Sequence, residues 1–363
     1  MRELVQMRSM FRLDPFTQSS PILRTRSLMQ GCSCAPKLFN KSLDVPAGKF
    51  VRQAGLKKWG ISINKKVRVS LVLFADNFWL FAKSKPELET MYEYWVGLLS
   101  QGGWSVPHDE AVWATTLPDE VCSEAFKLGT QFIVRRKRDE PIKILGTMVQ
   151  LSGSFEAEID FRIARVWTGF FRYRDTLCNR NIPLSMRFHF LNMMFASVGG
   201  WCSGTWTPTK QQLRRLNGVQ LKMLRKMLRL PRKPWESDHS YFRRSASIFK
   251  GLRKKHRLLT WESIVNRSIY AWAGHVHRIA TYDECRLTCV VQRWRDRAFL
   301  KSQEKLHGTQ GHGRRFKAWR WETPCYKYFE SNFYNKTWHE AALDKKHWDS
   351  LLDQMTLWRN HNR

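Results

Sequence analysis

The chain has 363 residues and a formal net charge of +31, from 62 lysines and arginines against 31 aspartates and glutamates. Hydrophobic residues make up 43% of it, with 17 tryptophans and 22 phenylalanines, which excludes a disordered chain, because disorder needs few aromatic residues. A positive excess of this size indicates a polyanionic partner, either nucleic acid or an anionic membrane.

Nucleic acid is the expected partner, because the sequence offers no means of crossing a membrane. No stretch approaches the roughly 18 uninterrupted apolar residues of a membrane span. Met1 is not followed by an apolar run with a cleavage site, as a secretion signal would require. We therefore expect RNA and DNA as partners, no membrane and no small-molecule cofactor, and a nuclear or cytoplasmic location. The eight cysteines are then expected to be mostly reduced thiols.

The predicted elements form an α/β unit followed by a basic helical unit. Two apolar runs, 67–74 and 78–82, meet at Ala75-Asp76-Asn77 and predict a hairpin. The next segment, 86–101, is predicted to be a helix that ends at Gly102-Gly103, and 142–149 is predicted to be a strand. From about residue 157 the pattern is helical, most clearly over 209–230, where apolar residues recur at steps of three and four.

Charge is distributed unevenly between the predicted α/β unit and the predicted helical unit. Residues 71–160 hold 8 basic and 14 acidic side chains, whereas residues 211–260 hold 15 basic and 2 acidic ones. Two surfaces with opposite electrostatic roles are therefore expected.

Asp76 is the first candidate functional residue. A carboxylate at the tip of a hairpin is held rigidly at a sheet edge, where it could bring Mg²⁺ to a phosphate. The alternative is that Asp76 only supports the turn, as aspartates in hairpin turns usually do.

Five stretches in order resemble the reverse transcriptases of non-LTR retrotransposons. The segment 30–40, QGCSCAPKLFN, is similar to a Gln-Gly-Cys-Pro-x-Ser-Pro-x-Leu-Phe-Asn stretch of that family. Phe74-Ala75-Asp76-Asn77 is similar to the family's Phe/Tyr-Ala-Asp-Asp box, and the helix 86–101 follows it. Ile144-Leu145-Gly146 resembles the strand at the primer grip, and 272–278 resembles a Trp-x-Gly-His-x-x-Arg signature of the tail. A Gly-Arg pair before a tryptophan, at 313–319, fits the same tail.

The resemblance implies an α+β fold, in which a partial right-hand polymerase palm of antiparallel sheet and helices precedes a mostly helical thumb and a C-terminal extension. The corresponding regions are 1–150 for the palm, 151–265 for the basic thumb and 266–363 for the retroelement tail. By resemblance, Asp76 and Asn77 are the catalytic positions, with Asp76 the ligand of Mg²⁺. The implied substrate-binding residues are Gln30, Gly31, Phe74, Ala75, Leu145 and Gly146.

Three departures from the family predict an inactive chain. Two-metal phosphoryl transfer needs ions about 3.5–4 Å apart, which carboxylates from two strands hold in place. The early strand with its aspartate should precede Gln30, where only Glu3 and Asp14 are acidic, so this strand and the fingers are expected to be absent. Asn77 replaces a carboxylate, and Glu110 falls near the position of a family lysine to which the resemblance assigns protonation of the leaving pyrophosphate. The chain is thus expected to descend from a polymerase but to be inactive on its own.

The basic helices are expected to bind primer–template through its phosphates, which gives grip without sequence reading. The candidates are Arg214, Arg215, Lys222, Arg225, Lys226, Arg229, Arg253, Lys254 and Lys255, with Arg243, Arg244 and Arg257 beside them. A non-catalytic basic helical module that binds nucleic acid is one alternative, and a merely solvated helix face, which the large positive excess disfavours, is the other. For His275, His277, Cys285 and Cys289, a zinc site and buried structural thiols both stay open.

Overall fold

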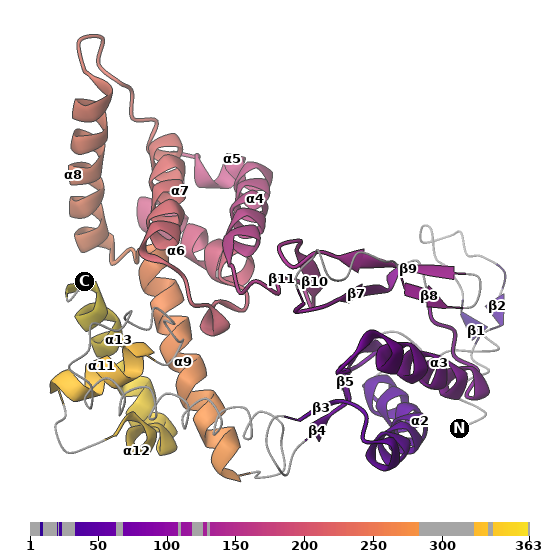
Figure 1. The fold of residues 1–363 in the computed structure, drawn as a ribbon. Coiled ribbons are helices and arrows are strands. Elements are labelled where there is room, and N and C mark those ends of the chain that lie inside the picture. Colours follow the sequence, from indigo (N-terminus) through magenta and orange to yellow (C-terminus); the bar gives the residue numbers. More distant parts are fainter. Residues whose placement is uncertain are drawn as a thin grey trace. The chain divides into compact units, whose positions relative to one another are not determined.

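The computed structural model describes residues 8–9, 20, 22–23, 33–62, 68–107, 110–117, 126–128, 131–282, 323–332 and 337–361 (Figure 1). It combines many helices with small antiparallel sheets, so the chain is mixed α and β. Two compact units are present, one of residues 1–113 and 124–135, the other of residues 114–123 and 136–363. Among the described residues, none of the helices combines the length and apolarity needed to cross a bilayer.

The first unit is built on two helices and a hairpin. Helices α2 (Ala35–Lys57) and α3 (Lys85–Gln101) pack around Phe50 and Trp95, and β5 (Leu71–Phe74) and β6 (Asn77–Leu80) add their apolar side chains to that core. The predicted hairpin and the helix after it are therefore confirmed. Ser84 caps α3 by accepting a hydrogen bond from the Glu87 amide at 3.4 Å.

The remaining strands are short. β1 (Arg8–Ser9) pairs with β2 (Ile22–Leu23), and β3 (Ile61–Ser62) pairs with β4 (Arg68–Val69). A three-stranded sheet has the order β7 (Val112–Ala114), β9 (Gln131–Arg136), β8 (Phe126–Leu128). Among the described strands, β5 and β6 pair only with each other.

The predicted single strand over 142–149 is wrong, because this segment is itself a hairpin. β10 (Ile142–Ile144) and β11 (Thr147–Val149) pair with Ile144 opposite Thr147, which leaves a two-residue turn. Two-residue turns that match the twist of a hairpin require positive φ. Leu145 and Gly146 both meet this requirement, with φ values of 47° and 80°. The apolar run concealed this turn, since only Gly146 marks it.

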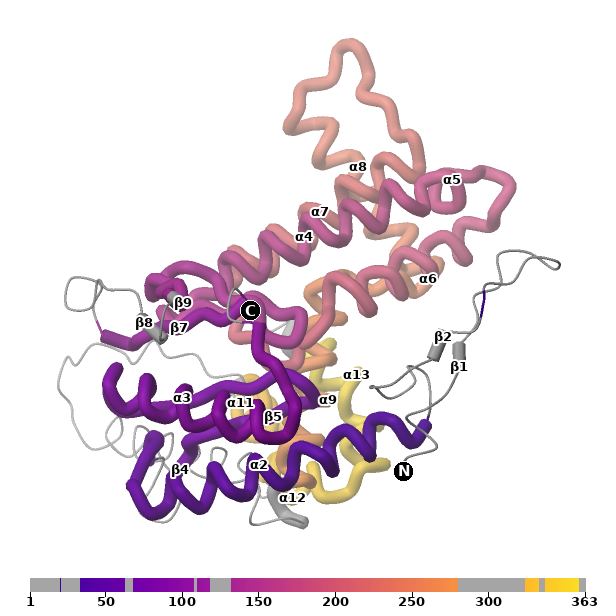
Figure 2. The backbone as a smooth tube through the Cα atoms, turned by 90° about the vertical axis from the view of Figure 1, so that its right-hand side faces the viewer, coloured from indigo at the N-terminus to yellow at the C-terminus, as the bar shows by residue number. Residues whose placement is uncertain are grey.

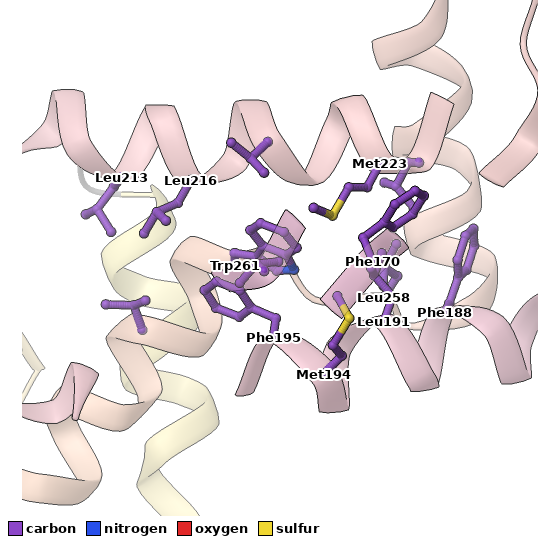
Figure 3. Packing of buried hydrophobic residues seen from close by; sticks show 14 of the residues in the cluster. Phe170, Phe188, Leu191, Met194, Phe195, Leu213, Leu216, Met223, Leu258 and Trp261 are labelled. Atoms are coloured by element: carbon purple, nitrogen blue, oxygen red, sulfur yellow. The ribbon is translucent and has the colours of Figure 1, made fainter. Parts of the chain in front are cut away.

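The second unit has two hydrophobic cores joined by one long helix. The first core lies among α4 (Glu156–Arg172), α6 (Leu184–Met194), the π-helix η2 (Phe195–Gly199), α7 (Lys210–Leu228), α8 (Asp238–His256) and the start of α9 (Trp261–Tyr282). Figure 3 shows Phe195 against Trp261 at its centre, with ring centroids 4.2 Å apart. The short helices α5 (Arg174–Leu177) and η3 (Ser203–Thr205) connect the longer ones.

Helix α7 confirms the predicted segment 209–230, and its ends explain its length. Thr209 and Gln212 form a capping box, with each side chain bonded to the other residue's amide. Arg229, at φ 48°, ends the helix in the left-handed conformation. The face with Leu213, Met223 and other apolar residues is buried, and α7 lies beside α4 (Figure 2).

The second core gathers the C-terminal helices around α9. It contains side chains of α11 (Thr323–Asn332), α12 (Trp338–Leu343) and α13 (Lys345–His361). Gly274 lets the Trp348 indole lie directly on α9, because a Cβ at this position would collide with that ring. The Trp348 Nε1 donates to the Tyr270 carbonyl at 3.0 Å. The glycine of the tail signature thus has a packing role.

Candidate nucleic-acid interface

Asp76 lies exposed at the tip of the β5–β6 hairpin. The turn holds Ala75 at a φ of 52°, and the Asn77 side-chain Nδ2 donates to the Asp76 carboxylate at 3.2 Å. Phe74 next to the turn is 60% exposed. Nowhere in the described part of the chain do three His, Cys, Asp or Glu side chains gather closely enough to hold a metal ion. Gln30 and Gly31 lie outside the described residues, so their expected place beside Asp76 stays a prediction.

The β10–β11 turn is fixed by a buried ion pair. The Arg162 Nε donates to the Glu158 carboxylate at 2.7 Å, and both side chains are almost fully buried. The Arg162 Nη2 also donates to the Gly146 carbonyl at 2.7 Å, and the Met148 amide donates to Glu158 at 2.7 Å. Leu145 is left 45% exposed at the tip. This pair therefore attaches the hairpin firmly to α4.

The Glu158–Arg162 pair was not predicted from the sequence. Its signal was present, because Arg162 falls in the stripe of α4 that otherwise carries Ile159, Val166 and Phe170. A charged residue in an apolar stripe is buried only when it is paired. The carbonyl and amide partners in the hairpin could not be inferred from the sequence.

The cations of α7 divide into bound and free groups. Arg215 makes ion pairs with Glu156, at 2.6 Å, and with Asp160, so it ties α7 to α4. Arg225 donates to the Ser245 hydroxyl at 3.0 Å and lies over the Phe242 ring at 4.7 Å, so it ties α7 to α8. Of the candidates predicted from the sequence, four exposed cations on α7 and at its end have no ion-pair partner among the described residues and are named the α7 cation set: Arg214, Lys222, Lys226 and Arg229.

Helix α8 divides in the same way. Arg253 is half-buried, its Nη2 donates to the Gln220 side chain at 2.7 Å, and burial lowers its pKa. The exposed cations without an ion-pair partner in the described part of the chain are named the α8 cation set: Arg243, Lys250, Lys254, Lys255 and Arg257. Of the twelve candidates, the two sets retain eight, and Lys250 is an addition to them.

A bidentate ion pair orders the loop between α7 and α8. Arg244 Nε and Nη2 donate to the two oxygens of Glu236, each at 2.8 Å, and the Lys233 amide adds a third bond at 3.2 Å. The hydrogen bond from Arg244 is the main cause that lowers the pKa of Glu236 to about 2. Exposed Trp235 and the cations around it are thereby carried on a fixed loop.

This pair predicts an acid-dependent loss of stability. Because the folded state lowers the pKa of Glu236 below its usual value of about 4.3, its stabilisation is complete above about pH 5 and declines as pH falls towards 2. The urea midpoint of the unaltered chain should therefore exceed that of Glu236→Gln at neutral pH, and the difference should shrink between pH 5 and 2. Asp349→Asn, an exposed carboxylate on α13, should show no comparable pH-dependent difference. A Glu236→Gln difference that stays constant with pH would contradict the assignment.

The histidines of the tail signature lie in packing positions. The His277 ring lies 4.8 Å from that of His339 and 5.5 Å from Trp338, whereas exposed His275 lies 5.5 Å from Trp272. Arg278 donates to the Ala342 carbonyl at 2.9 Å and so holds α12 against α9. Cys285, Cys289 and the 313–319 segment lie outside the described residues, so the zinc alternative stays open.

Comparison with known proteins adds no relative. No family model matches the chain, and no curated protein matches it in sequence. The candidate site therefore rests on its own geometry. The first unit presents an exposed single carboxylate, and the second unit carries the α7 and α8 cation sets, which have no acidic partners among the described residues.

Proposed function

We propose that this protein binds nucleic acid through its phosphate backbone, by the outward faces of α7 and α8. The observation that carries this proposal is the presence of nine exposed cations in the α7 and α8 cation sets without an ion-pair partner in the described residues. Cations left without internal counterions attract a polyanion and gain affinity when its condensed counterions are released. Such contacts position a duplex without reading its bases.

The burial of the apolar face of α7 favours nucleic acid over an anionic membrane as the polyanionic partner. Helices that bind bilayers place an apolar face into the lipid and keep cations at its border. The apolar face of α7, with Leu213, Leu216 and Met223, is buried in the core instead. Only its basic face is available to a partner. From Arg214 to Lys226 that face extends about 18 Å, at about 1.5 Å per residue.

A binding comparison tests this proposal. The chain should bind an RNA–DNA primer–template and an unrelated duplex of equal length with similar affinity, as measured by filter binding. It should not bind neutral vesicles, and its affinity for vesicles of anionic lipid should be weaker than for either duplex. Strong binding to anionic vesicles with no retention of nucleic acid would overturn the proposal.

We further propose descent from the reverse transcriptase of a non-LTR retrotransposon. The support is the order of the resembling stretches, together with their local structure. A hairpin presents Asp76 in its turn, α3 follows that hairpin, and Leu145-Gly146 forms a second turn before the basic helices. The palm and thumb arrangement belongs to this proposal, and the alternative remains a basic helical module of other origin.

Polymerase activity is expected to be absent. One exposed carboxylate cannot fix two Mg²⁺ ions about 3.5–4 Å apart. A primer-extension assay with Mg²⁺ or Mn²⁺ should therefore show no template-dependent synthesis, and Asp76→Ala should behave like the unaltered chain. Synthesis that Asp76→Ala abolishes would show that the chain is an active polymerase, with Asp76 as a metal ligand.

A further inference from the structure

A cavity of about 770 Å³ opens in the second unit where α4, α5 and the end of α7 meet. Phe170 and Phe171 form its apolar side. The polar wall carries four cations, which are Arg174 and Arg180 from α5 and the turn after it, and Lys226 and Arg229 from the end of α7. Asn179 and Asn181 also line the cavity.

The polar wall is held in shape by a buried arginine. Arg187 is 7% exposed, and its Nη1 donates to the carbonyls of Leu177 and Met227, both at 3.3 Å. Its Nε donates to the Ile182 carbonyl at 3.0 Å. One guanidinium thus joins α5, the turn after it and the end of α7. The cations on these segments are therefore presented by a fixed frame.

The charge of the wall is not balanced from within. All four cations are exposed, and none forms an ion pair with the described residues. Among the described residues that line the cavity, Asp175 is the one carboxylate. The carbonyls at the end of α7 explain why Lys226 and Arg229 lie there, because a helix C-terminus stabilises nearby cations. They do not explain the presence of Arg174 and Arg180, which belong to another segment and line the same cavity.

We propose that this cavity binds the terminal phosphate of a nucleic-acid strand. The proposal rests on the function proposed above and names a particular contact within it. An internal phosphate carries chain on both sides, whereas a terminal phosphate can enter a cavity from one side. It also carries nearly two negative charges at neutral pH, because its second pKa is about 6. Arginine guanidinium groups bind such a group by paired hydrogen bonds, and the asparagine amides add neutral donors.

The test compares one oligonucleotide with and without a 5′-phosphate, by fluorescence anisotropy on the full chain. The phosphorylated strand should bind about tenfold more tightly, because the unphosphorylated strand lacks one charge-assisted contact with the cavity. Arg174→Gln/Arg180→Gln should abolish this preference, because it removes two of the four cations that line the cavity. Both side chains are exposed, so their replacement should leave the core unchanged. The matched control Lys345→Gln/Lys346→Gln, which removes two exposed charges on α13, should retain it. A nucleoside monophosphate in excess should compete with the phosphorylated strand only.

Each outcome decides the proposal. Equal affinity for the two strands, or a preference that survives Arg174→Gln/Arg180→Gln, overturns the cavity assignment and leaves the broader nucleic-acid function intact. Equal loss of the preference in the control pair would mean that total charge and not the cavity recognises the phosphate. Absence of binding to both strands overturns both proposals together.

Discussion

Reversing two charges on α7 should weaken nucleic-acid binding by roughly 30- to 1000-fold. Arg214→Glu/Lys222→Glu changes four unit charges on an exposed face, and each is expected to contribute about 0.5–1 kcal/mol in the screened surroundings of a surface. The two positions lie eight residues apart on the same helix and make no ion pair with the described residues. Fold and stability should therefore be retained, which circular dichroism can establish.

The matched control for this variant is Lys345→Glu/Lys346→Glu. It makes the same change in net charge at exposed positions at the start of α13, a helix that is not part of the proposed contact surface. We expect less than about a fivefold loss, from the long-range field alone. The affinities are to be measured by filter binding at one ionic strength. Equal losses in the two variants would show that net charge rather than the α7 face binds the ligand.

Glu158→Ala should lower the free energy of unfolding of the second unit by about 3–5 kcal/mol, because it leaves the buried Arg162 charge unpaired. It also removes the acceptor of the Met148 amide, so the β10–β11 hairpin should loosen. Urea unfolding measures the first effect, and faster exchange of the Met148 amide hydrogen measures the second.

Asp160→Ala is the matched control for Glu158→Ala. Asp160 lies two residues later on α4 and also pairs with an arginine, but its side chain is 62% exposed, so its removal should cost less than about 1 kcal/mol. The double variant Glu158→Leu/Arg162→Met should be less destabilised than Glu158→Ala, since no unpaired charge is buried. If Glu158→Ala were as mild as Asp160→Ala, the pair would not hold the hairpin.

The sequence predicted the elements whose signals are local. The turn at Ala75-Asp76, the helix that ends at Gly102 and the α7 segment were all correct, because turn residues, caps and periodicity lie within a few positions of the structure they specify. The strand predicted over 142–149 was wrong, because one glycine in an apolar run gave too weak a turn signal.

The distinction between bound and free cations could not be predicted. Arg214 and Arg215 are neighbours in one basic run, yet only Arg215 meets Glu156, 59 positions away in the sequence. Likewise, Gly274 looked like part of a functional signature, whereas its neighbour is the indole of Trp348. Such roles depend on long-range packing. The sequence pattern alone does not indicate which distant residue each side chain contacts.

The central claim is that cations on α7 and α8 bind phosphates, and the salt dependence of affinity for an RNA–DNA primer–template tests it most directly. If between five and nine of these cations contact phosphates, a plot of log affinity against log salt concentration should be a straight line with a slope between about −4.5 and −8. A slope near zero would contradict the claim, because affinity would then not come from phosphate contacts.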